Sequence, residues 1–505
     1  MSLTSAVRRA AQVRPQGLAI LQGEQRTTWP ETASRIARMA GALRTRGVTP
    51  GKRVATLALN SPEYFELLMA VWWAGAVLVP LNTRLAADEI AFILDHAQPC
   101  LLVMDEAMSA LGLKAAPTSL ATVVCDAPGL AQMLGAQPIE DCAPGHGSTA
   151  GIFYTGGTTG KPKGVELSHQ NFAMAAVNMQ RDLAHREDTV YLHASPMFHL
   201  ADFGIGLGVT LAAGGHSFMP RFTPEAFYER LRRDRITHLQ LVPTMLAAVL
   251  DAPCRDDALL AGIQRISYGA APIASSLLER TLAAFPNARI HQFYGMTESC
   301  GASVMLPPER HVLAGPLAGK LRAAGQVTAG FELRIADEAG AAVAPGTVGE
   351  IQVRGPAVMT GYWNDPQQTA ATVVNGWLRS GDGGFLDEDG FVHVVDRLKD
   401  MIISGGENIY SAEVESALAS HPGVLSCAVV GLPDERWGER VHAVVIARPD
   451  ANLVVDELDA HCRAHLAGYK VPRSYDFADA LPLSGIGKVQ KKILREQCVA
   501  RGRVA

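Results

Sequence analysis

The segment from Tyr154 to Gly164 carries residues whose types and spacing suit phosphate chemistry. It reads Tyr-Thr-Gly-Gly-Thr-Thr-Gly-Lys-Pro-Lys-Gly, so glycines are interspersed with hydroxyl groups and lysines. Glycines let backbone amides converge on a phosphate, while hydroxyl and ammonium groups add hydrogen bonds and positive charge. We interpret the segment as a loop that holds the phosphates of a nucleotide. Its assigned residues are Thr155, Gly156, Gly157, Thr158, Thr159, Gly160, Lys161 and Lys163.

This loop differs from the P-loop of kinases and ATPases. The P-loop pattern requires a glycine at the position that Thr155 occupies here, and it places Ser or Thr after the lysine, where this chain has Pro162. A P-loop nucleotide hydrolase is therefore disfavoured. A surface turn rich in glycine and threonine is the alternative that the loop alone leaves open.

Helical and strand patterns alternate in the part of the chain that must position this loop. Apolar residues recur at helical spacing over residues 31–46, and a short buried strand follows at 54–59. The alternation returns through residues 64–104 and 226–285. Helices that connect successive strands build parallel sheets with helices on their faces. The sequence predicts an α/β protein whose large N-terminal domain has layered, mainly parallel sheets.

Two changes of pattern divide the rest of the chain. Residues 329–396 contain short strand-like runs separated by turns, which predicts a β-rich subdomain. From residue 400, helices and strands fill about a hundred residues, the size of one small α+β domain. We predict an N-terminal domain over residues 1–398 and a C-terminal domain over 399–505. No linker-like sequence separates them, so the boundary is predicted to be a short hinge.

Composition and charge narrow the class of protein. Of the 505 residues, 48% are hydrophobic and 19% charged, which suits a globular enzyme of several domains. With a net charge of -5, the chain has no excess of positive charge to attract the phosphates of nucleic acid, which disfavours nucleic acid as a partner. Eight scattered cysteines without a C-x-x-C pair favour reduced thiols and a cytoplasmic location. The apolar run 67–81 is too short for a membrane span and predicts a buried helix that leads into a strand.

Further motifs accompany the phosphate loop in a fixed order over more than three hundred residues. With the loop, they resemble the adenylate-forming superfamily, which includes acyl- and aryl-CoA synthetases, nonribosomal peptide adenylation domains and firefly luciferase. One such motif would be weak evidence, whereas an ordered series is strong. The motifs are Pro196-Met-Phe-His199, Tyr268-Gly-Ala-Ala-Pro272, Tyr294-Gly-Met-Thr-Glu298, Ser380-Gly-Asp382, Asp396-Arg-Leu-Lys-Asp400, Ser404-Gly-Gly-Glu-Asn408 and Gly485-Ile-Gly-Lys488.

The resemblance implies an AMP-forming acid:CoA ligase that uses ATP, Mg²⁺ and CoA. Glu298 is implied to be a catalytic residue and a magnesium ligand, because its carboxylate offers a hard oxygen. Asp382 and Arg397 are implied to hold ribose and phosphate oxygens. A turn-capping aspartate and a surface arginine are the alternative for these two. The other implied nucleotide contacts are Gly269, Ala270, Ala271, Tyr294, Gly295, Met296 and Thr297.

Lys488 resembles the catalytic lysine of this superfamily, whose ammonium bridges the carboxylate and the phosphate during adenylation. Lysines near a C-terminus are otherwise usually solvated charges, and we expect this of the neighbouring Lys491 and Lys492. In the resembling enzymes the small C-terminal domain is mobile and rotates about a hinge residue, here Lys399, between the two half-reactions.

CoA is implied to reach the adenylate beside the face of the rotating domain that carries residues 404–408. Gly405 and Gly406 would let its pantetheine arm pass close to the backbone, although a tight turn would explain the same pair of glycines. Arg84 and Trp437 resemble positions near the CoA channel of arene-CoA ligases.

The segment after His199 bears on the identity of the acid. By resemblance, His199 lies at the entrance of the acyl pocket, where direct catalysis and a packed structural role both stay open. Domains that activate amino acids typically place an aspartate near this position, whereas Leu200 follows His199 here, so activation of an amino acid is disfavoured. It stays open because the register of Asp202 is uncertain. The candidate pocket walls are nearly all apolar, which predicts a medium-chain fatty acid or an arylcarboxylic acid. They are Leu200, Ala201, Phe203, Ile205, Thr244, Met296 and Cys300.

Other functions stay open beside the main prediction. The same motifs would serve an enzyme that loads the pantetheine of a carrier protein, but no carrier domain follows within the 505 residues. A noncatalytic nucleotide-binding module is disfavoured because Lys488, Glu298, Asp382 and Arg397 occur together. The sequence predicts small-molecule partners and leaves the oligomeric state open.

Overall fold

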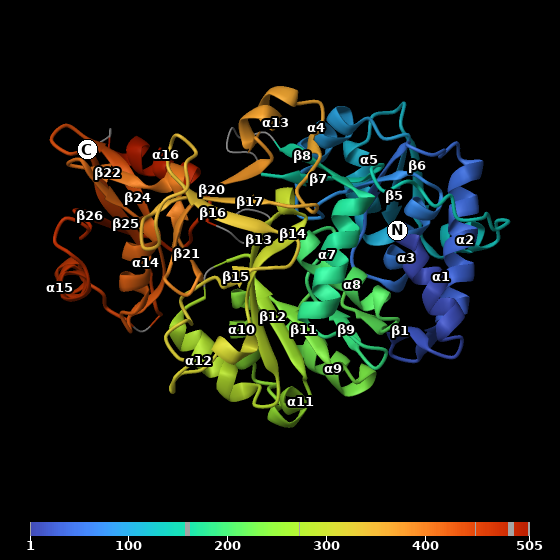
Figure 1. Ribbon diagram of the computed structural model, residues 1–505, viewed down its shortest axis with the longest axis horizontal. Helices are drawn as coiled ribbons and strands as arrows, with labels where there is room; N and C mark the ends of the chain where they lie inside the picture. The colour runs from blue at the N-terminus through green and yellow to red at the C-terminus, as the bar shows by residue number, and fades with distance from the viewer. Residues whose placement is uncertain (1, 157–161, 272, 450, 483–488, 503–505) are drawn as a thin grey trace. The chain divides into compact units, whose positions relative to one another are not determined.

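The structure is a computed structural model in which two compact units can be distinguished (Figure 1). The first unit comprises residues 1–333 and 353–379, and the second comprises residues 334–352 and 380–505. The predicted boundary between residues 398 and 399 falls within the second unit's range and stays a prediction, as does the hinge at Lys399. The described residues are 2–156, 162–271, 273–449, 451–482 and 489–502.

The helices of the first unit begin where the sequence supplies caps. Thr28 accepts from the backbone of Glu31 while Glu31 accepts from the backbone of Thr28, which starts the second helix. The helices are α1 (Thr4–Val13), α2 (Trp29–Thr45), α3 (Pro62–Trp73), α4 (Ala87–Ala97), α5 (Glu106–Ala115), α6 (Ala127–Leu134), α7 (His169–Asp182), α8 (Leu200–Leu211), α9 (Pro224–Asp234), α10 (Pro243–Leu250), α11 (Asp257–Ala261), α12 (Ser275–Ala284) and α13 (Pro366–Thr372).

One sheet of the first unit has seven strands. They are β3 (Arg53–Leu57), β4 (Val77–Pro80), β5 (Leu101–Asp105), β6 (Ala121–Cys125), β7 (Thr149–Thr155), β8 (Lys163–Ser168) and β18 (Gly361–Tyr362). Their order is β18-β8-β7-β4-β3-β5-β6, and the run from β7 to β6 is parallel. Strands β8 and β18 pair antiparallel at one edge.

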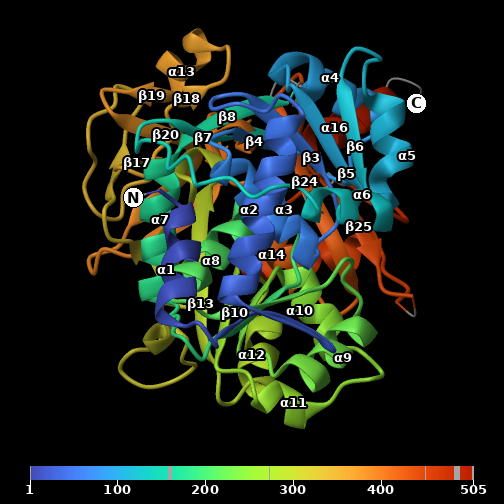
Figure 2. The ribbon, with the colours of Figure 1, turned by 90° about the vertical axis from the view of Figure 1, so that its right-hand side faces the viewer.

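The parallel part of this sheet is covered by helices on both faces (Figure 2). Successive residues of β5 show why, because Leu101 and Val103 join one core cluster while Leu102 and Met104 join another. The first cluster includes residues of α2 and α3, and the second includes residues of α4 and α5. A strand buried on both faces must be apolar throughout, which is the pattern that the sequence shows.

A second sheet of the first unit has nine strands. They are β1 (Leu18–Gln22), β2 (Gln25–Thr28), β9 (Val190–His193), β10 (Gly215–Phe218), β11 (His238–Leu241), β12 (Arg265–Gly269), β13 (Arg289–Met296), β14 (Gly301–Leu306) and β15 (Gln326–Val327). Their order is β15-β14-β13-β12-β11-β9-β10-β1-β2, and the strands from β13 to β1 are parallel. The short helices η1 (Thr297–Ser299) and η2 (Pro308–Arg310) flank β14.

The predicted β-rich subdomain is a five-stranded sheet. Its strands are β16 (Glu332–Ala336), β17 (Gly349–Arg354), β19 (Val373–Val374), β20 (Trp377–Leu386) and β21 (Val392–Arg397). The order is β16-β17-β20-β19, and β21 pairs antiparallel with β20. Residues of this sheet are shared between the two units.

The second unit contains a further five-stranded sheet with a helix layer on each face. The elements are η3 (Leu398–Asp400), β22 (Ile402–Ser404), β23 (Glu407–Ile409), α14 (Ser411–Ala419), β24 (Val424–Asp434), β25 (Gly438–Ala447), α15 (Val455–His465), β26 (Ser474–Phe477) and α16 (Lys491–Gly502). Val441, Ala443 and Val445 face a core formed with α14 and α15. Val444 faces a separate core formed with α16.

The structure confirms the predicted fold class: parallel sheets layered with helices, a β-rich subdomain and an α+β C-terminal part. The apolar run 67–81 forms the end of α3 and then β4, as expected. Among the described residues, no helix combines the length and the apolar character that a bilayer span needs. All eight cysteines are free thiols.

Buried histidines make the stability of the first unit depend on pH. Burial lowers the pKa of His169, His238 and His311 to about 4. It lowers the pKa of His291 to about 3. In the unfolded chain each would titrate near pH 6.5. As the pH falls, these histidines therefore bind protons in the unfolded chain before they do so in the folded chain. The stability that is present above about pH 6.5 is lost as the pH falls toward about 4.

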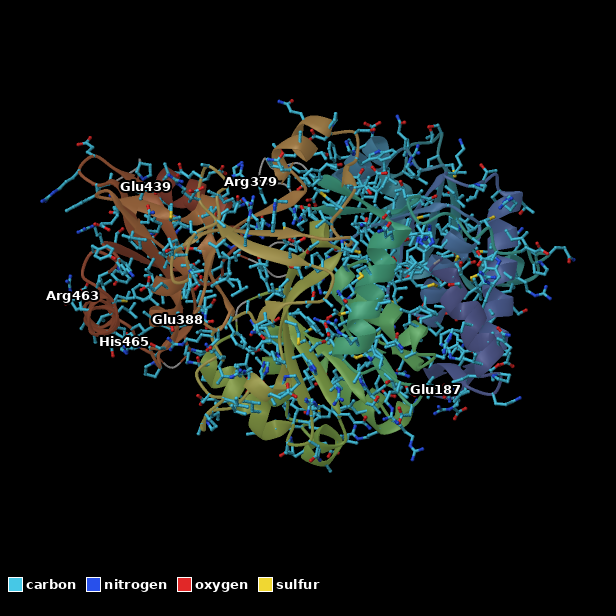
Figure 3. All side chains as sticks on the ribbon, viewed as in Figure 1. Glu187, Arg379, Glu388, Glu439, Arg463 and His465 are labelled. Atoms are coloured by element: carbon cyan, nitrogen blue, oxygen red, sulfur yellow. The ribbon has the colours of Figure 1, made fainter. Side chains whose placement is uncertain are left out.

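We expect the midpoint of thermal unfolding to fall steadily over this pH interval. Replacing His169 by asparagine should make the dependence shallower, because one shifted group contributes up to about 3 kcal/mol. His465, which lies exposed on α15 (Figure 3), provides the control, and His465→Asn should leave the slope unchanged. A midpoint that stays constant or rises as the pH falls would contradict this account.

Candidate functional site

Segments predicted to bind the nucleotide or the acid follow the carboxyl ends of parallel strands of one sheet. In the nine-stranded sheet, β9 leads to the segment with His199, β12 ends at Gly269, and β13 ends at Met296. Because these strands are parallel, their carboxyl ends meet at one edge of the sheet. Ligands of α/β sheets bind at this kind of edge. The fold thus brings together segments that lie about a hundred residues apart in the chain.

Two glycines at this edge are required by close packing of the backbone. A Cβ atom on Gly269 would lie 2.3 Å from the carbonyl oxygen of Phe293, and one on Gly295 would lie 2.0 Å from that of Gly301. Ala270, next to the first of them, is exposed and has a φ of +63°, a left-handed conformation that costs free energy in a non-glycine residue. Close approach of backbone to backbone therefore explains these glycines without a ligand.

The phosphate loop connects two strands at the edge of the seven-stranded sheet. Thr155 at the end of β7 pairs with Lys163 at the start of β8. A Cβ atom on Gly156 would meet no described atom within 4 Å. Arg84 follows β4 of the same sheet and is exposed. Five predicted loop residues lie outside the described part of the chain: Gly157, Thr158, Thr159, Gly160 and Lys161.

Tyr362 joins the phosphate loop to the predicted magnesium ligand. Its hydroxyl donates a hydrogen bond to Glu298 Oε1 at 2.8 Å, and Lys163 Nζ lies 5.3 Å from the centre of its ring. Strand β18 carries Tyr362 beside β8, where it pairs with Val165. The carbonyl of Glu298 accepts from the backbone of Met359 at 2.8 Å, which fixes η1 to the same segment.

The environment of Glu298 suits a carboxylate that binds a hard cation. The residue is only 7% exposed. Burial, and then the carboxylate of Glu298, raise the pKa of Tyr362 well above its ordinary value, so its hydroxyl stays protonated and remains a donor. Within the described ranges, the hydrogen bond from Tyr362 is made to Oε1 of Glu298, and no donor to Oε2 is found.

Tyr362 was not predicted from the sequence. It lies in a two-residue strand in a turn-rich region, and nothing in the spacing or charge around it distinguishes it from an ordinary sheet tyrosine. Its contacts with Glu298, 64 positions earlier in the chain, and with Lys163 give it a functional context.

Replacing Tyr362 by phenylalanine should weaken the use of Mg²⁺ without unfolding the protein. A hydrogen bond to a charged group contributes about 1.5 kcal/mol, so the rate at limiting Mg²⁺ should fall about 10-fold and recover partly when Mg²⁺ is raised. Tyr228→Phe is the matched control, because Tyr228 is also buried and donates to the carbonyl of Val249 away from the site. A loss of activity that ignores the Mg²⁺ concentration would argue for a purely structural role.

Asp382 and Arg397, the two predicted ribose or phosphate contacts, are partners across strands β20 and β21. Arg397 Nε lies 2.7 Å from Asp382 Oδ1. The backbone amide of Asp382 donates to Ser380 Oγ at 3.0 Å, and Ser380 Oγ donates to the carbonyl of Ile351 at 2.6 Å. Strand pairing and this turn hold the carboxylate and the guanidinium side by side in the second unit.

Two of the segments predicted to contact CoA are adjacent in the second unit. The backbone amide of Gly405 donates to the carbonyl of Trp437 at 2.8 Å, and a Cβ on Gly405 would lie 2.9 Å from the indole ring. Gly405 and Gly406 have φ values of +64° and +83°, so the hairpin turn itself requires glycine. The guanidinium of Arg473 lies 4.2 Å from the Trp437 ring centre, and that of Arg436 lies 4.7 Å away.

The prediction for Lys491 was wrong, while Lys488 lies outside the described residues. Instead of being solvated, Lys491 is largely buried, lies 2.8 Å from Glu415 Oε1 and donates to Ser411 Oγ. The physical reason is that α16 packs on the sheet and turns its first residue toward α14. Lys492 is exposed, as predicted.

Asp202 is part of the core and does not offer its carboxylate to an acyl pocket. Tyr191 donates to its Oδ1 at 2.9 Å, and His193 Nδ1 lies 2.5 Å from its Oδ2. Both oxygens are therefore occupied in a fully buried network. His199, three residues earlier, is the half-exposed residue that precedes α8, and its ring lies 4.4 Å from that of Phe198. An ammonium group would find no free carboxylate at Asp202.

Most of the predicted pocket walls lie in or beside the core. The ring of Phe203 contacts those of Trp72 and Phe172, and Ile205 belongs to a cluster with Tyr191. Leu200 and Cys300 are also buried, while Ala201 and Thr244 are exposed.

Known proteins match the chain over nearly its whole length. Residues 7–363 match the family model described as AMP-binding enzyme, and residues 413–488 match the AMP-binding enzyme C-terminal domain. A feruloyl-CoA synthase from Amycolatopsis sp is 41% identical and covers 97% of each chain. A fatty acid–[acyl-carrier-protein] ligase from Streptomyces coeruleorubidus is 35% identical over 96% of this chain and 94% of its own. The solved structure of o-succinylbenzoate coenzyme A synthetase from Bacillus subtilis, in complex with ATP and a magnesium ion, is 32% identical, covers 96% of this chain and 98% of its own, and has a TM-score of 0.86.

Proposed function

We propose that this chain, which belongs to the AMP-binding enzyme family, is an AMP-forming acid:CoA ligase. In the first step a carboxylate oxygen attacks the α-phosphorus of ATP, which forms an acyl-adenylate and releases pyrophosphate. In the second step the thiol of CoA attacks the acyl carbonyl and AMP leaves. The similarity to a feruloyl-CoA synthase supports this reaction.

The contact of Tyr362 with both Lys163 and Glu298 is the observation that carries the proposal. Joining two anions requires positive charge and ordered positioning. Lys163 supplies a cation beside the phosphate loop, and Glu298 would hold Mg²⁺ through its carboxylate. When bound, that ion neutralises charge on the phosphates of ATP. The complex of a relative with ATP and magnesium supports this pair of ligands.

The remaining predicted residues would take the roles that the motifs imply. Asp382 would accept hydrogen bonds from the ribose hydroxyls, and Arg397 would donate to ribose or phosphate oxygens. Lys488 would bridge the carboxylate and the phosphate during adenylation. Gly405, Gly406 and Trp437 would border the path of CoA. We further propose a hinge at Lys399 and a cytoplasmic location.

The acid is proposed to be a lipophilic monocarboxylic acid, either an arylcarboxylic acid or a medium-chain fatty acid. Asp202 cannot recognise an ammonium group while Tyr191 and His193 occupy its oxygens, which disfavours amino acids. The similarity to ligases of ferulic acid and of fatty acids supports both classes of substrate.

The acceptor can be tested by measuring the thioester product. The enzyme would be supplied with ATP, Mg²⁺ and a panel of aryl, fatty and amino acids, with either CoA or a pantetheinylated carrier protein as the thiol. We expect acyl-CoA from aryl or fatty acids and none from amino acids. Thioester on the carrier protein but never on CoA would instead favour the second candidate function, which the carrier-protein ligase among the relatives motivates.

A further inference from the structure

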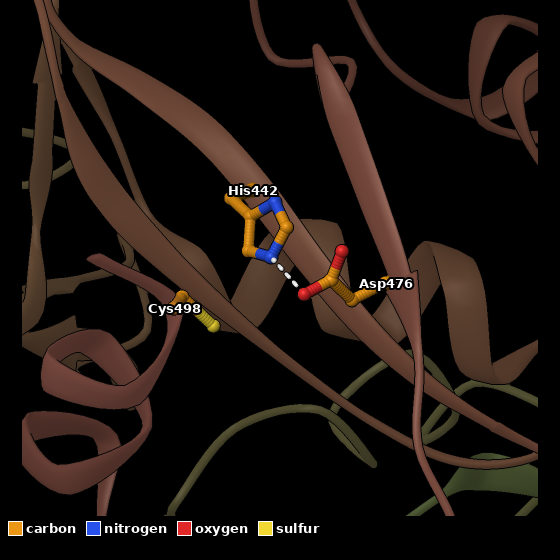
Figure 4. A group of neighbouring side chains, drawn as sticks. All are labelled: His442, Asp476 and Cys498. Atoms are coloured by element: carbon orange, nitrogen blue, oxygen red, sulfur yellow. Dashed lines mark ion pairs between the residues drawn. The ribbon is translucent and has the colours of Figure 1, made fainter. Parts of the chain in front are cut away.

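A histidine, an aspartate and a cysteine converge in the second unit, and none of them is among the residues assigned to catalysis. His442 lies on β25, Asp476 on β26 and Cys498 on α16, and one ligand atom from each lies within 4.8 Å of the others (Figure 4). His442 is 4% exposed and Cys498 is 6% exposed, while Asp476 is partly exposed. The group therefore lies at the border between the core and the solvent.

Strand register and helix packing bring these side chains to one face of the sheet. His442 pairs with Ser474 in the parallel ladder of β25 and β26, so Asp476, two residues further on, points to the same side. Helix α16 covers this side, where Cys498 packs in a core cluster with Val444. The three positions are set by elements of regular structure, which holds candidate ligands more firmly than loops would.

One nitrogen of His442 is buried and has no hydrogen-bond partner among the described residues, although it lies within ion-pair distance of Asp476. Its Nδ1 forms a hydrogen bond of 2.8 Å with Ser474 Oγ. Its Nε2 has no hydrogen-bond partner within the described part of the chain, and the closest oxygen of Asp476 is 3.7 Å away, beyond hydrogen-bonding distance. If Nδ1–H donates this hydrogen bond to Ser474 Oγ, Nε2 presents a lone pair toward Asp476 and Cys498. Histidine ligands of metals are oriented in this way by a hydrogen bond from the second nitrogen.

We propose that His442 Nε2, the Asp476 carboxylate and Cys498 Sγ form a Zn²⁺ site. Nitrogen, carboxylate oxygen and thiolate sulfur together suit this borderline-soft ion. Three protein ligands leave a fourth tetrahedral position for water. Binding converts the Cys498 thiol to a thiolate, and its proton passes to the solvent.

The site needs only a small adjustment to close around the ion. Ligand atoms of a tetrahedral zinc ion lie about 3.6 Å apart when the bonds are about 2.0–2.3 Å long. The largest separation here, at most 4.8 Å, must shorten by up to about 1 Å, whereas the 3.7 Å between His442 Nε2 and Asp476 Oδ2 already fits. Arg501, whose Nη1 lies 3.8 Å from Asp476 Oδ2, is largely exposed and can turn away into solvent. The bound ion would tie the last helix to the sheet.

The test uses the full chain loaded with Zn²⁺ or Co²⁺. X-ray absorption at the zinc edge should show one sulfur at about 2.3 Å and nitrogen or oxygen atoms at about 2.0–2.2 Å. Co²⁺ should give a thiolate-to-cobalt charge-transfer band at one ion per chain. A zinc ion with no sulfur neighbour would overturn the proposal, and this measurement needs no variant.

Variants then identify which cysteine supplies the sulfur ligand and test the role of Ser474. Cys498→Ser should abolish the charge-transfer band, and Cys462→Ser, which changes another buried cysteine of the unit, should retain it. Ser474→Ala should weaken Zn²⁺ binding by about 10- to 100-fold through loss of the histidine's partner.

The surface of α15 provides the main alternative metal site. His461 and His465 are one helical turn apart, with ring centres separated by 4.4 Å, and such a pair can bind cobalt without a thiolate. The double variant His461→Gln, His465→Gln should therefore keep the charge-transfer band. A band that survives Cys498→Ser, or that disappears with the histidine pair, would overturn the site.

Discussion

Lys488→Ala is expected to lower the rate of acyl-adenylate formation by about 10²- to 10³-fold, the loss typical of removing one preorganised charge from a transition state. The lysine is proposed to neutralise negative charge as the carboxylate oxygen joins the α-phosphorus. Transfer of the acyl group from a supplied adenylate to CoA should stay close to the wild-type rate, because the lysine would have left the site by then. Pyrophosphate release and thioester formation would be measured separately.

The two neighbouring lysines provide controls of different kinds. Lys492 is exposed, so Lys492→Ala should leave both half-reactions unchanged. Lys491→Ala breaks the pair with the largely buried Glu415 and should lower the stability of the second unit rather than one half-reaction. Equal damage to both half-reactions in Lys488→Ala would contradict the proposed rotation of the C-terminal domain between the two half-reactions.

Glu298→Gln is expected to lower adenylation about 10²-fold, since a neutral amide binds Mg²⁺ far more weakly than a carboxylate. The amide oxygen can still accept from Tyr362, so the local fold should be kept. The variant should need much more Mg²⁺ for half-maximal rate, which a titration of the initial rate against Mg²⁺ would measure.

Glu166→Gln is the matched control for this change. Glu166 lies on the strand that begins at Lys163, and its Oε1 accepts from the hydroxyl of Thr149, so the carboxylate already has a structural partner. Its Mg²⁺ dependence should match that of the wild type. If Glu298→Gln kept the wild-type Mg²⁺ dependence, another group would have to hold the ion.

Much of the fold follows from patterns that are local in the sequence. The residues of β5 are apolar without alternation, which predicts a strand buried on both faces, and they do contact two cores. The order of strands within each sheet was not predictable, because it depends on contacts between distant segments. The pairing of β18 with β8 joins residues that are almost two hundred positions apart.

Some residues of the candidate site could likewise be predicted from the sequence, and others could not. Motif residues such as Glu298 and Asp382 were predicted because their motifs resemble those of the adenylate-forming superfamily, and their side-chain types suit the implied roles. Tyr362 was missed because its importance rests on a hydrogen bond that only the folded chain makes. Lys491 was misjudged because a charge in a short helix looks solvated until its partner, Glu415, is known. The glycines at 269 and 295 were assigned to nucleotide binding, and backbone packing also requires them.

Exchange of labelled pyrophosphate into ATP tests the central claim most directly. It reports reversal of the first half-reaction and needs neither CoA nor a carrier protein. We predict exchange that requires both Mg²⁺ and an aryl or fatty acid, followed by release of AMP when CoA is added. Absence of exchange with every carboxylic acid offered, from folded protein at saturating Mg²⁺ and ATP, would contradict the account.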